Sequence, residues 1–334
     1  MLSALYARAA AWRRRWYQSR PAARRRLSRP VVSVGALAAG GRGKTPVAAL
    51  VAERLRDAGE RPALLSRGYG RRLRSRDAVV VRDPDGVRAS VDTAGDEPRM
   101  LAERLDGVSV VVAEDRYLAG RLAEKRLDAT VHVLDDGFQH LRLARDLDLL
   151  LVHPGDLGQP TFPAGRLREP PAAARLADAL VVEAADSAAA GTVADRLGKD
   201  IRFLMRRSLG SPRPVAGSRA GEGIAGPVLA VAGIAAPERF REALIGAGFE
   251  VADTLAFADH HRFTPADVRR IAARAVTCHA GLVLTTEKDA VRLAPLAPFD
   301  FALAAVPLRV AIEPADRFRE WLLERVAAAA GGGR

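Results

Sequence analysis

The sequence predicts an α/β protein. Its main unit is a mostly parallel sheet with helices on both faces, followed by a smaller second α/β domain and preceded by an N-terminal amphipathic helix. Two observations carry this prediction. Short apolar runs alternate with helical patterns after Pro30, which is the order of parallel strands joined by crossover helices. A stretch rich in proline and glycine at residues 209–227 then separates two such blocks.

The length of 334 residues and the 49% apolar fraction allow the cores of two ordinary domains. The one cysteine, Cys278, excludes an internal disulfide and suits a reducing compartment, and we interpret it as a free thiol in the core. We expect five segments: an amphipathic helix at 1–27, a first domain at 28–208, a linker at 209–227, a second domain at 228–312, and a C-terminal helix and tail at 313–334.

Positive charge is concentrated at the N-terminus. Nine arginines precede residue 30 and the first acid is Glu53, so subtracting nine from the net charge of +12 leaves +3 for the rest. The sequence therefore shows no spread basic face of the kind that nucleic-acid binders use, and we expect no nucleic-acid partner. Lysine is rare, which points to Lys44 and Lys288 as positions that need a compact ammonium.

Residues 1–27 have the pattern of an amphipathic helix. Six side chains share one apolar arc: Leu2, Leu5, Tyr6, Ala9, Trp12 and Trp16. Arg8, Arg14 and Arg15 lie outside this arc, whereas Arg13 falls inside it. No apolar run approaches the roughly 20 residues that span a bilayer, and no signal-peptide core or cleavage site is evident. The pattern favours a helix lying in an anionic membrane interface, with an ordinary packed surface helix as the alternative.

The body divides into expected strands and helices. Strands are expected at 31–34, 63–66, 109–113, 130–134, 147–152, 179–183, 228–231, 282–285 and 301–312. Helices are expected at 46–58, 97–105, 117–127, 238–247, 265–275 and 315–328. Residues 154–171 hold five prolines and no periodicity, which predicts a long loop.

A glycine-rich loop follows the first strand of the body. Its residues are Gly40, Gly41, Arg42, Gly43, Lys44 and Thr45, and a helix follows with Pro46 in its first turn. This context predicts a P-loop NTPase-type fold, in which backbone N–H groups hold phosphate oxygens, Lys44 reaches the β- and γ-phosphates and the Thr45 hydroxyl binds Mg²⁺. Ala38 occupies the first glycine position of the usual pattern. A chance glycine-rich turn is the alternative.

Acidic residues follow the apolar strand at 131–134. Asp135 and Asp136 stand where a Walker-B strand places acids for Mg²⁺, although a pair of solvated turn acids would look the same. Asp96 precedes another expected helix and either caps it or accepts the proton of an attacking hydroxyl. The pair His260 and His261 and the segment 286–289 carry little information alone.

These motifs occur together in one family, and the chain resembles the tetraacyldisaccharide 4′-kinases of lipid A biosynthesis. The matching stretches are GGRGKTP (40–46), SRGYG (66–70), GDEP (95–98), DDGFQH (135–140), REP (168–170), the DH of FADHHRF (257–263) and TEKDAVR (286–292). The resemblance implies transfer of the γ-phosphoryl group of ATP, with Mg²⁺, to the 4′-hydroxyl of an acylated glucosamine disaccharide 1-phosphate. It also implies peripheral attachment to the cytoplasmic face of the inner membrane, where the basic helix would contact anionic lipid.

The resemblance also implies roles for single residues. Asp96 would be the general base with His260 as its partner, Lys44 and Thr45 would serve ATP and Mg²⁺, and Asp136 and Glu169 would be further metal-site acids. Four positions would line the substrate cleft: Ser66, Arg116, Gln139 and Arg168. Ala36 stands where the family usually has Asn, and Arg42 where it usually has Thr. The rival class is a membrane-anchored P-loop switch ATPase, which would need no acceptor substrate.

Overall fold

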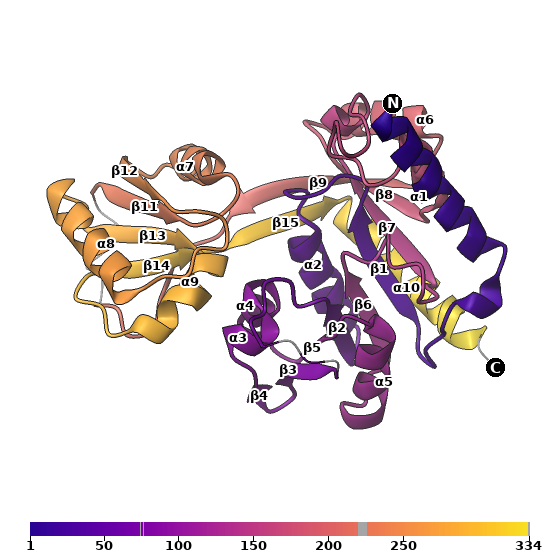
Figure 1. Cartoon of the computed structure of the whole chain (residues 1–334), viewed down its shortest axis with the longest axis horizontal. Coiled ribbons are helices and arrows are strands. Elements are labelled where there is room, and N and C mark those ends of the chain that lie inside the picture. Colours follow the sequence, from indigo (N-terminus) through magenta and orange to yellow (C-terminus); the bar gives the residue numbers. More distant parts are fainter. Residues whose placement is uncertain (74, 76, 220–225, 333–334) are drawn as a thin grey trace.

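The computed structural model describes residues 1–73, 75, 77–219 and 226–332, and Figure 1 shows that they form two lobes connected by the long strands β9 and β15. Within these residues the larger lobe contains a ten-stranded sheet in the order β15–β9–β8–β7–β1–β6–β2–β5–β3–β4. The strands are β1 (Val31–Ala36), β2 (Pro62–Ser66), β3 (Val79–Asp83), β4 (Gly86–Val87), β5 (Ser109–Val112), β6 (Val131–Asp135), β7 (Leu147–Val152), β8 (Ala179–Glu183), β9 (Arg202–Leu209) and β15 (Leu308–Glu313).

The strands from β9 through β5 run parallel, and the strands at both edges of the sheet run antiparallel. Helices α2 (Lys44–Asp57), α4 (Asp96–Arg104) and α10 (Ala315–Gly331) pack on one face of this sheet. Helices α5 (Arg116–Arg126) and α6 (Ser187–Leu197) pack on the other. Because both faces are covered, the central strands are fully buried and read as continuous apolar runs. The predicted fold class is confirmed.

The smaller lobe has a five-stranded sheet among its described residues, in the order β10–β14–β13–β11–β12. Its strands are β10 (Arg213–Pro214), β11 (Val228–Ala232), β12 (Val251–Ala256), β13 (Leu282–Thr286) and β14 (Leu303–Val306). Its helices are α7 (Pro237–Gly246), α8 (Pro265–Thr277) and α9 (Glu287–Leu293). Cys278 follows α8, where it is partly buried against the apolar core of this lobe.

The single strand expected at 301–312 is wrong in one respect. Pro307, which has no N–H to donate, separates β14 from β15, and the two strands belong to different sheets. Within the expected linker at 209–227, Arg213 and Pro214 pair with β14, and residues 220–225 lie outside the described residues. The domain boundaries given above stay a prediction.

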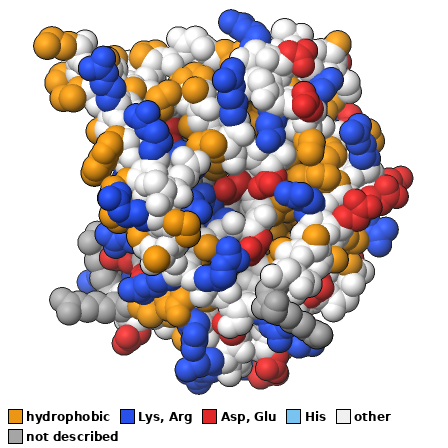
Figure 2. Space-filling model, turned by 90° about the vertical axis from the view of Figure 1, so that its right-hand side faces the viewer, with side chains coloured by type: hydrophobic (Ala, Val, Ile, Leu, Met, Phe, Trp, Pro, Cys, Tyr) orange, Lys and Arg blue, Asp and Glu red, His pale blue; other side chains and the backbone are white. Residues whose placement is uncertain are grey.

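The N-terminal helix α1 (Leu2–Gln18) lies along the larger lobe (Figure 1). Ser3, Ala7, Ala10 and Ala11 are partly buried and Arg14 is only 4% exposed, while Tyr6 packs edge-on against Phe162. Most of the predicted apolar arc is exposed: Leu2, Leu5 and Trp12 are 69%, 68% and 63% exposed, whereas Trp16 is partly buried. On this side of the molecule, hydrophobic and basic side chains are interspersed (Figure 2). Among the described residues, no helix has the length and apolar character needed to cross a membrane.

Candidate active site

The glycine-rich loop connects β1 to the N-terminus of α2. Gly40, Gly41 and Gly43 have φ angles of 70°, 65° and 73°, a left-handed conformation that side chains with a Cβ rarely adopt. Ala38 is fully buried and its backbone pairs with Leu167, so this position needs no left-handed glycine. The loop therefore turns sharply into α2, and the unpaired N–H groups and positive end of the helix lie where phosphate binds in such folds.

Arginine side chains support the outer side of this loop. Arg42 forms an ion pair with the buried Asp156, and Arg207 on β9 donates to the Gly41 carbonyl oxygen at 3.0 Å and to Glu183 at 2.7 Å. The guanidinium of Arg42 is thus directed to a partner in the loop after β7. The departure from the family pattern at this position therefore adds a support for the loop.

Lys44, Thr45 and the two strand-end acids come together at one edge of the large sheet. The Lys44 ammonium lies 3.6 Å from Asp136, and the Thr45 hydroxyl donates to Asp135 at 3.1 Å. Because β1 and β6 are adjacent and parallel, their carboxyl ends meet at this edge. Arg168 donates to both carboxylate oxygens of Asp136, at 2.7 and 2.9 Å. Asp136 itself has a φ of 58°, so a tight turn directs its side chain.

The two acids differ in proton affinity. Burial, together with the charges of Glu97 and Asp136, raises the pKa of Asp135 to about 7. Burial alone would also raise the pKa of Asp136, but the hydrogen bond from Arg168 and the charge of Lys44 hold it below its usual value. Burial lowers the pKa of the Lys44 ammonium. The crowding of acidic charge around Asp135 is the environment that a divalent cation would neutralise.

This chemistry fits Mg²⁺. A hydroxyl and a carboxylate are the hard oxygen ligands that this ion takes, and in nucleotide sites phosphate and water supply the rest. Among residues 1–73, 75, 77–219 and 226–332, no three or more His, Cys, Asp or Glu side chains are grouped to enclose a metal by themselves. A site completed by a bound nucleotide agrees with this finding.

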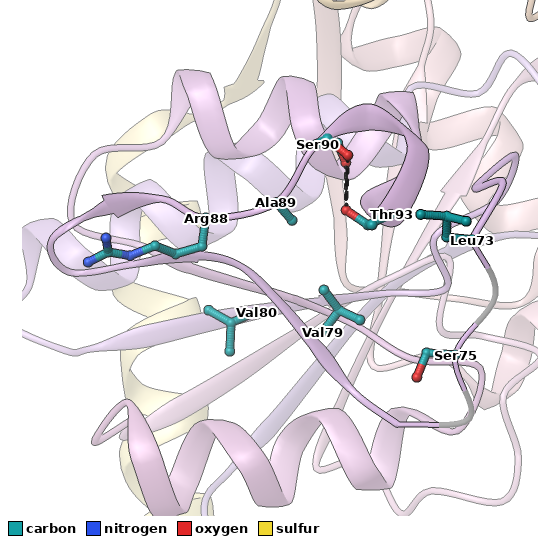
Figure 3. Close-up of a pocket in the computed structure, with 8 residues that line it drawn as sticks. All are labelled: Leu73, Ser75, Val79, Val80, Arg88, Ala89, Ser90 and Thr93. Carbon is teal, nitrogen blue, oxygen red and sulfur yellow. Dashed lines mark hydrogen bonds between the residues drawn. The ribbon is translucent and has the colours of Figure 1, made fainter.

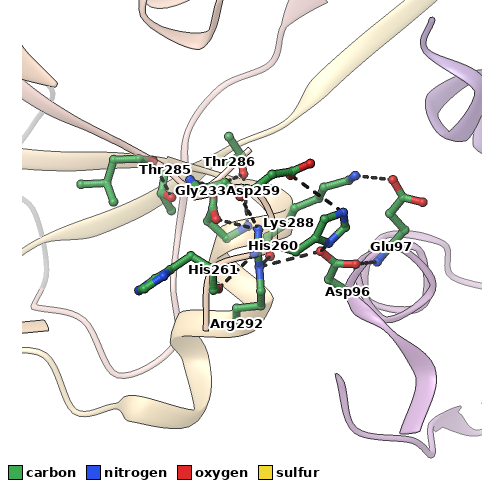
Figure 4. Close-up of polar contacts among 12 residues, drawn as sticks. Asp96, Glu97, Gly233, Asp259, His260, His261, Thr285, Thr286, Lys288 and Arg292 are labelled. Carbon is green, nitrogen blue, oxygen red and sulfur yellow. Dashed lines mark hydrogen bonds and ion pairs between the residues drawn. The ribbon is translucent and has the colours of Figure 1, made fainter. Parts of the chain in front are cut away.

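A second cluster joins the two lobes (Figure 4). Asp96, the first residue of α4, lies 2.9 Å from Nδ1 of His260 in the smaller lobe. Within the described part of the chain, its other oxygen accepts only from the adjacent Glu97 N–H, and Gly95 occupies the N-cap position. Helix capping therefore does not account for the position of the Asp96 carboxylate, which is 4% exposed and points at His260. The lobes are already in contact at this pair.

The charges around this pair favour its ionised form. Burial alone would raise the pKa of Asp96, but His260, Lys288 and Arg292 together hold it below its usual value. The hydrogen bond to Asp96 outweighs burial and raises the pKa of His260. His261, by contrast, stacks on Phe257 and bonds to Asp267, away from Asp96.

Sequence reasoning missed two residues of this cluster. Glu97 forms an ion pair with Lys288 of the smaller lobe. Arg292 lies 3.8 Å from Asp96 and donates to the carbonyl oxygens of His261 and Gly233, at 3.0 Å each. Both residues fall inside stretches that match the family, 95–98 and 286–292. Their place in these stretches was the signal that could have identified them.

The remaining predicted residues lie at the same edge of the sheet. Ser66 ends β2, next to the end of β6. Arg116 opens α5, and burial and the charge of Arg67 lower its pKa to about 10. Gln139 donates to Glu169 at 3.0 Å. Both oxygens of Glu169 accept from Arg14, so in this structure its partners are cationic and amide groups, and a metal role for it stays a prediction.

A separate hollow of about 530 Å³ lies beside the β3–β4 hairpin and is shown in Figure 3. Leu73, Val79, Val80 and Ala89 make much of its wall, and Arg88 and Ser90 stand at its edge. None of the loop or acid residues described above lines it.

A glycine loop at a strand end, a lysine and threonine opening the next helix, and acids on the neighbouring strand define a P-loop phosphotransferase. The model of the tetraacyldisaccharide-1-P 4′-kinase family matches residues 1–327. A tetraacyldisaccharide 4′-kinase of Geobacter metallireducens is 41% identical over 282 residues, 81% of each chain. One of Syntrophus aciditrophicus is 37% identical over 325 residues, 90% of this chain and 84% of the other.

Among solved structures, LpxK from Aquifex aeolicus in complex with ATP is similar, with a TM-score of 0.78 and 32% identity over 97% of both chains. The chain belongs to the tetraacyldisaccharide-1-P 4′-kinase family.

Proposed function

We propose that this protein transfers the γ-phosphoryl group of ATP to the 4′-hydroxyl of a tetraacylated glucosamine disaccharide 1-phosphate, giving a lipid A precursor. One observation supports the proposal: a phosphate-binding part and a proton-accepting part of one proposed site come together where the two lobes meet. The glycine loop and Lys44 lie on the larger lobe, and the pair of Asp96 and His260 lies where the smaller lobe meets it. Glu97, next to Asp96, is close enough for its charge to act on Asp135.

The donor half of the proposed site acts by positioning and charge. Backbone N–H groups of the glycine loop and the N-terminus of α2 would hold the β- and γ-phosphates. Lys44 is partly buried, with its ammonium beside Asp136, so its charge is held in a poorly solvated place where it stabilises developing negative charge more than it would in water. Arg168 keeps Asp136 turned toward that ammonium.

Thr45, Asp135 and Asp136 are the residues that would hold Mg²⁺, which when bound neutralises charge on the β- and γ-phosphates. The Thr45 hydroxyl already faces Asp135 at 3.1 Å, so the two oxygens need little rearrangement to serve one cation. Glu169 is the least suited of the predicted metal-site acids because Arg14 occupies both of its oxygens.

Asp96 would accept the proton of the attacking 4′-hydroxyl, and His260 would hold that carboxylate in place. A carboxylate with a lowered pKa is a weak base, but phosphoryl transfer is loose and leaves the proton on the attacking oxygen until late. The orientation of the Asp96 carboxylate therefore matters more than its proton affinity. Glu97 and Lys288 join the lobes next to this pair and would keep it closed.

The lipid acceptor is reached from a membrane surface, and α1 is the element suited to it. The lobe contacts α1 through Arg14 and the alanines on the same side, which leaves Leu2, Leu5 and Trp12 exposed. A helix of this kind lies in the headgroup region with its apolar arc in the acyl boundary and its arginines near anionic lipid. We place the protein at the cytoplasmic face of the inner membrane, peripherally attached.

Mass spectrometry of the lipid product tests the proposal. Full-length protein is incubated with ATP, Mg²⁺ and purified tetraacyldisaccharide 1-phosphate in detergent micelles, with the Lys44→Ala variant as control. The expected product is heavier by one phosphoryl group, appears only with the wild type, and is matched by ADP release that depends on the lipid. ATP turnover of equal rate without lipid, and no phosphorylated lipid, would instead identify a switch ATPase.

A further inference from the structure

Arg14 is the one arginine of α1 that is buried among the described residues, at 4% exposure. Its Nε donates to Glu169 at 2.5 Å, and Nη2 donates to the other oxygen of Glu169 at 2.6 Å. Nη2 also donates to the Phe138 carbonyl oxygen at 2.9 Å, and the guanidinium lies over the Phe138 ring at 4.1 Å. A fork of this kind fixes both the position and the orientation of what it holds.

The partners of Arg14 are sequence neighbours of the site residues. Phe138 follows Asp136 by two positions, and Glu169 directly follows Arg168, which donates to Asp136. Gln139 closes the network, because it donates to Glu169 at 3.0 Å and to the Ala36 carbonyl oxygen at 3.2 Å. Arg168 also donates to the Ala36 carbonyl oxygen, at 3.1 Å. Gln139 and Arg168 therefore both contact the end of β1, where the glycine loop begins.

We infer that Arg14 is a positioning residue for the active site, and that α1 must be seated on the larger lobe for Asp136 and Arg168 to hold their arrangement. The inference deepens the proposed function and rests on it, since α1 would then both contact lipid and order the donor half of the site. Arg14 touches none of the reacting groups and acts through Glu169 and Phe138.

Burial makes this coupling strong. A buried arginine whose carboxylate partner is removed, or a buried carboxylate left without its arginine, is an uncompensated charge, so breaking either side favours release of α1. Contacts near the start of the helix add to the seating: the Thr161 hydroxyl donates to the Ser3 carbonyl oxygen at 2.8 Å, and Tyr6 packs edge-on against Phe162. The fork from Arg14 is the buried contact that reaches Glu169, and the exposed Arg13 adds a bond from its Nη1 to the Gln139 carbonyl oxygen at 3.2 Å.

The test compares Arg14 with its neighbour Arg15, which is exposed on the same helix. R14A and R15A remove the same charge, and R14K and R15K keep it, so each pair changes membrane electrostatics alike. A lysine cannot reproduce the fork to Glu169 and Phe138. We expect kcat to fall by about 10- to 100-fold in R14A and by about fivefold in R14K, as for misplaced catalytic groups. We expect both Arg15 variants to stay near the wild type in kcat.

Two further measurements separate positioning from attachment and folding. Flotation on phosphatidylglycerol-containing vesicles should be unchanged in R14K. Hydrogen exchange by mass spectrometry should rise in R14K over peptides covering 135–140 and 168–170, and R15K should show no such rise. This exchange readout holds even if no phosphorylated lipid forms, so failure of the proposed function remains distinguishable. Unchanged exchange, or kcat values within twofold of the Arg15 variants, would overturn the inference.

Discussion

The donor half and the acceptor half of the site are built in different ways. Lys44 and Thr45 open the helix after β1, and Asp135 ends the strand next to it, so the parallel sheet alone brings them together. Asp96 and His260 are 164 positions apart and meet only because two lobes touch. The donor half is therefore as stable as the core beneath it, whereas the acceptor half depends on how the lobes sit.

This difference shows how a kinase can separate binding from transfer. A nucleotide can occupy a preformed loop before any acceptor arrives, but the proposed proton acceptor, Asp96 with His260, is complete only when the lobes meet. Coupling of this kind excludes water while the phosphoryl group is reactive. The predictions below test whether the two halves are as independent as their construction indicates.

The largest effect is expected in the donor half. Lys44→Ala should reduce kcat by more than about 10³-fold, since the lost charge stabilisation is on the order of several kcal/mol. The melting temperature should stay close to that of the wild type, because packing of α2 depends on Val47, Val51 and Leu55 and not on this ammonium. Steady-state kinetics and thermal unfolding measure the two quantities. A variant with near-normal turnover would remove Lys44 from the site.

Substitutions in the acceptor half should lower kcat by a smaller factor, and the effects of its two residues should overlap. Asp96→Asn keeps the shape of the side chain but not its proton affinity, and should lower kcat about 10²- to 10⁴-fold. His260→Ala should also slow the reaction, and the double variant should lose less than the product of the two single losses, as groups acting as a unit do. His261→Ala is the matched control, since His261 bonds to Asp267 instead. Fully multiplicative losses would mean that the two residues act separately.

Membrane attachment should belong to the larger lobe alone. Leu5→Glu with Trp12→Glu should abolish flotation with anionic vesicles and leave the melting temperature unchanged, because both side chains are more than 60% exposed. Val276→Glu with Ile245→Glu adds the same charge to exposed apolar positions of the smaller lobe, which are 77% and 46% exposed. The second pair should float as the wild type does. Equal loss in both pairs would make net charge, and not α1, the cause.

The smallest expected effect is a shift in the titration of His260. Its pKa is raised by the bond to Asp96, so its contribution to the lobe contact is fully present below the ordinary value of about 6.5 and is lost as pH rises through the raised value. In Asp96→Asn the pKa should return toward the ordinary value. Histidine-labelled NMR titration of both proteins measures it. An identical pKa in the two would show that the contact is absent in solution.

The sequence was sufficient to predict the core of the larger lobe. Continuous apolar runs identified β1, β6, β7 and β8, and the tight spacing of glycine, lysine and threonine located the loop. The strand β9 was missed because it is half polar, and the helix α6 was missed because its buried face is mostly alanine and it contains a glycine. Both elements are positioned by their contacts with the large sheet and not by a local sequence pattern.

For the site, spacing alone predicted the donor half and left the acceptor half open. The pairing of Asp96 with His260 came from the resemblance to a family, since no local pattern encodes a contact between lobes. Arg14 shows a similar limit. Helical geometry placed Arg14 outside the apolar arc. It could not show that the side of α1 with Arg14 packs on the larger lobe, or that Glu169 is its partner there.

The strands β9 and β15 have one more consequence. Leu209 pairs with Leu308, and the Gly210 N–H donates to the Pro307 carbonyl oxygen at 2.8 Å, so the chain leaves the large sheet and returns to it at one point. In terms of chain connectivity, the smaller lobe is inserted between two neighbouring strands of the large sheet, and a short hairpin turn could join these strands in its place. Excising residues 211–306 would leave a ten-stranded sheet with its loop intact, a miniature nucleotide-binding protein lacking His260.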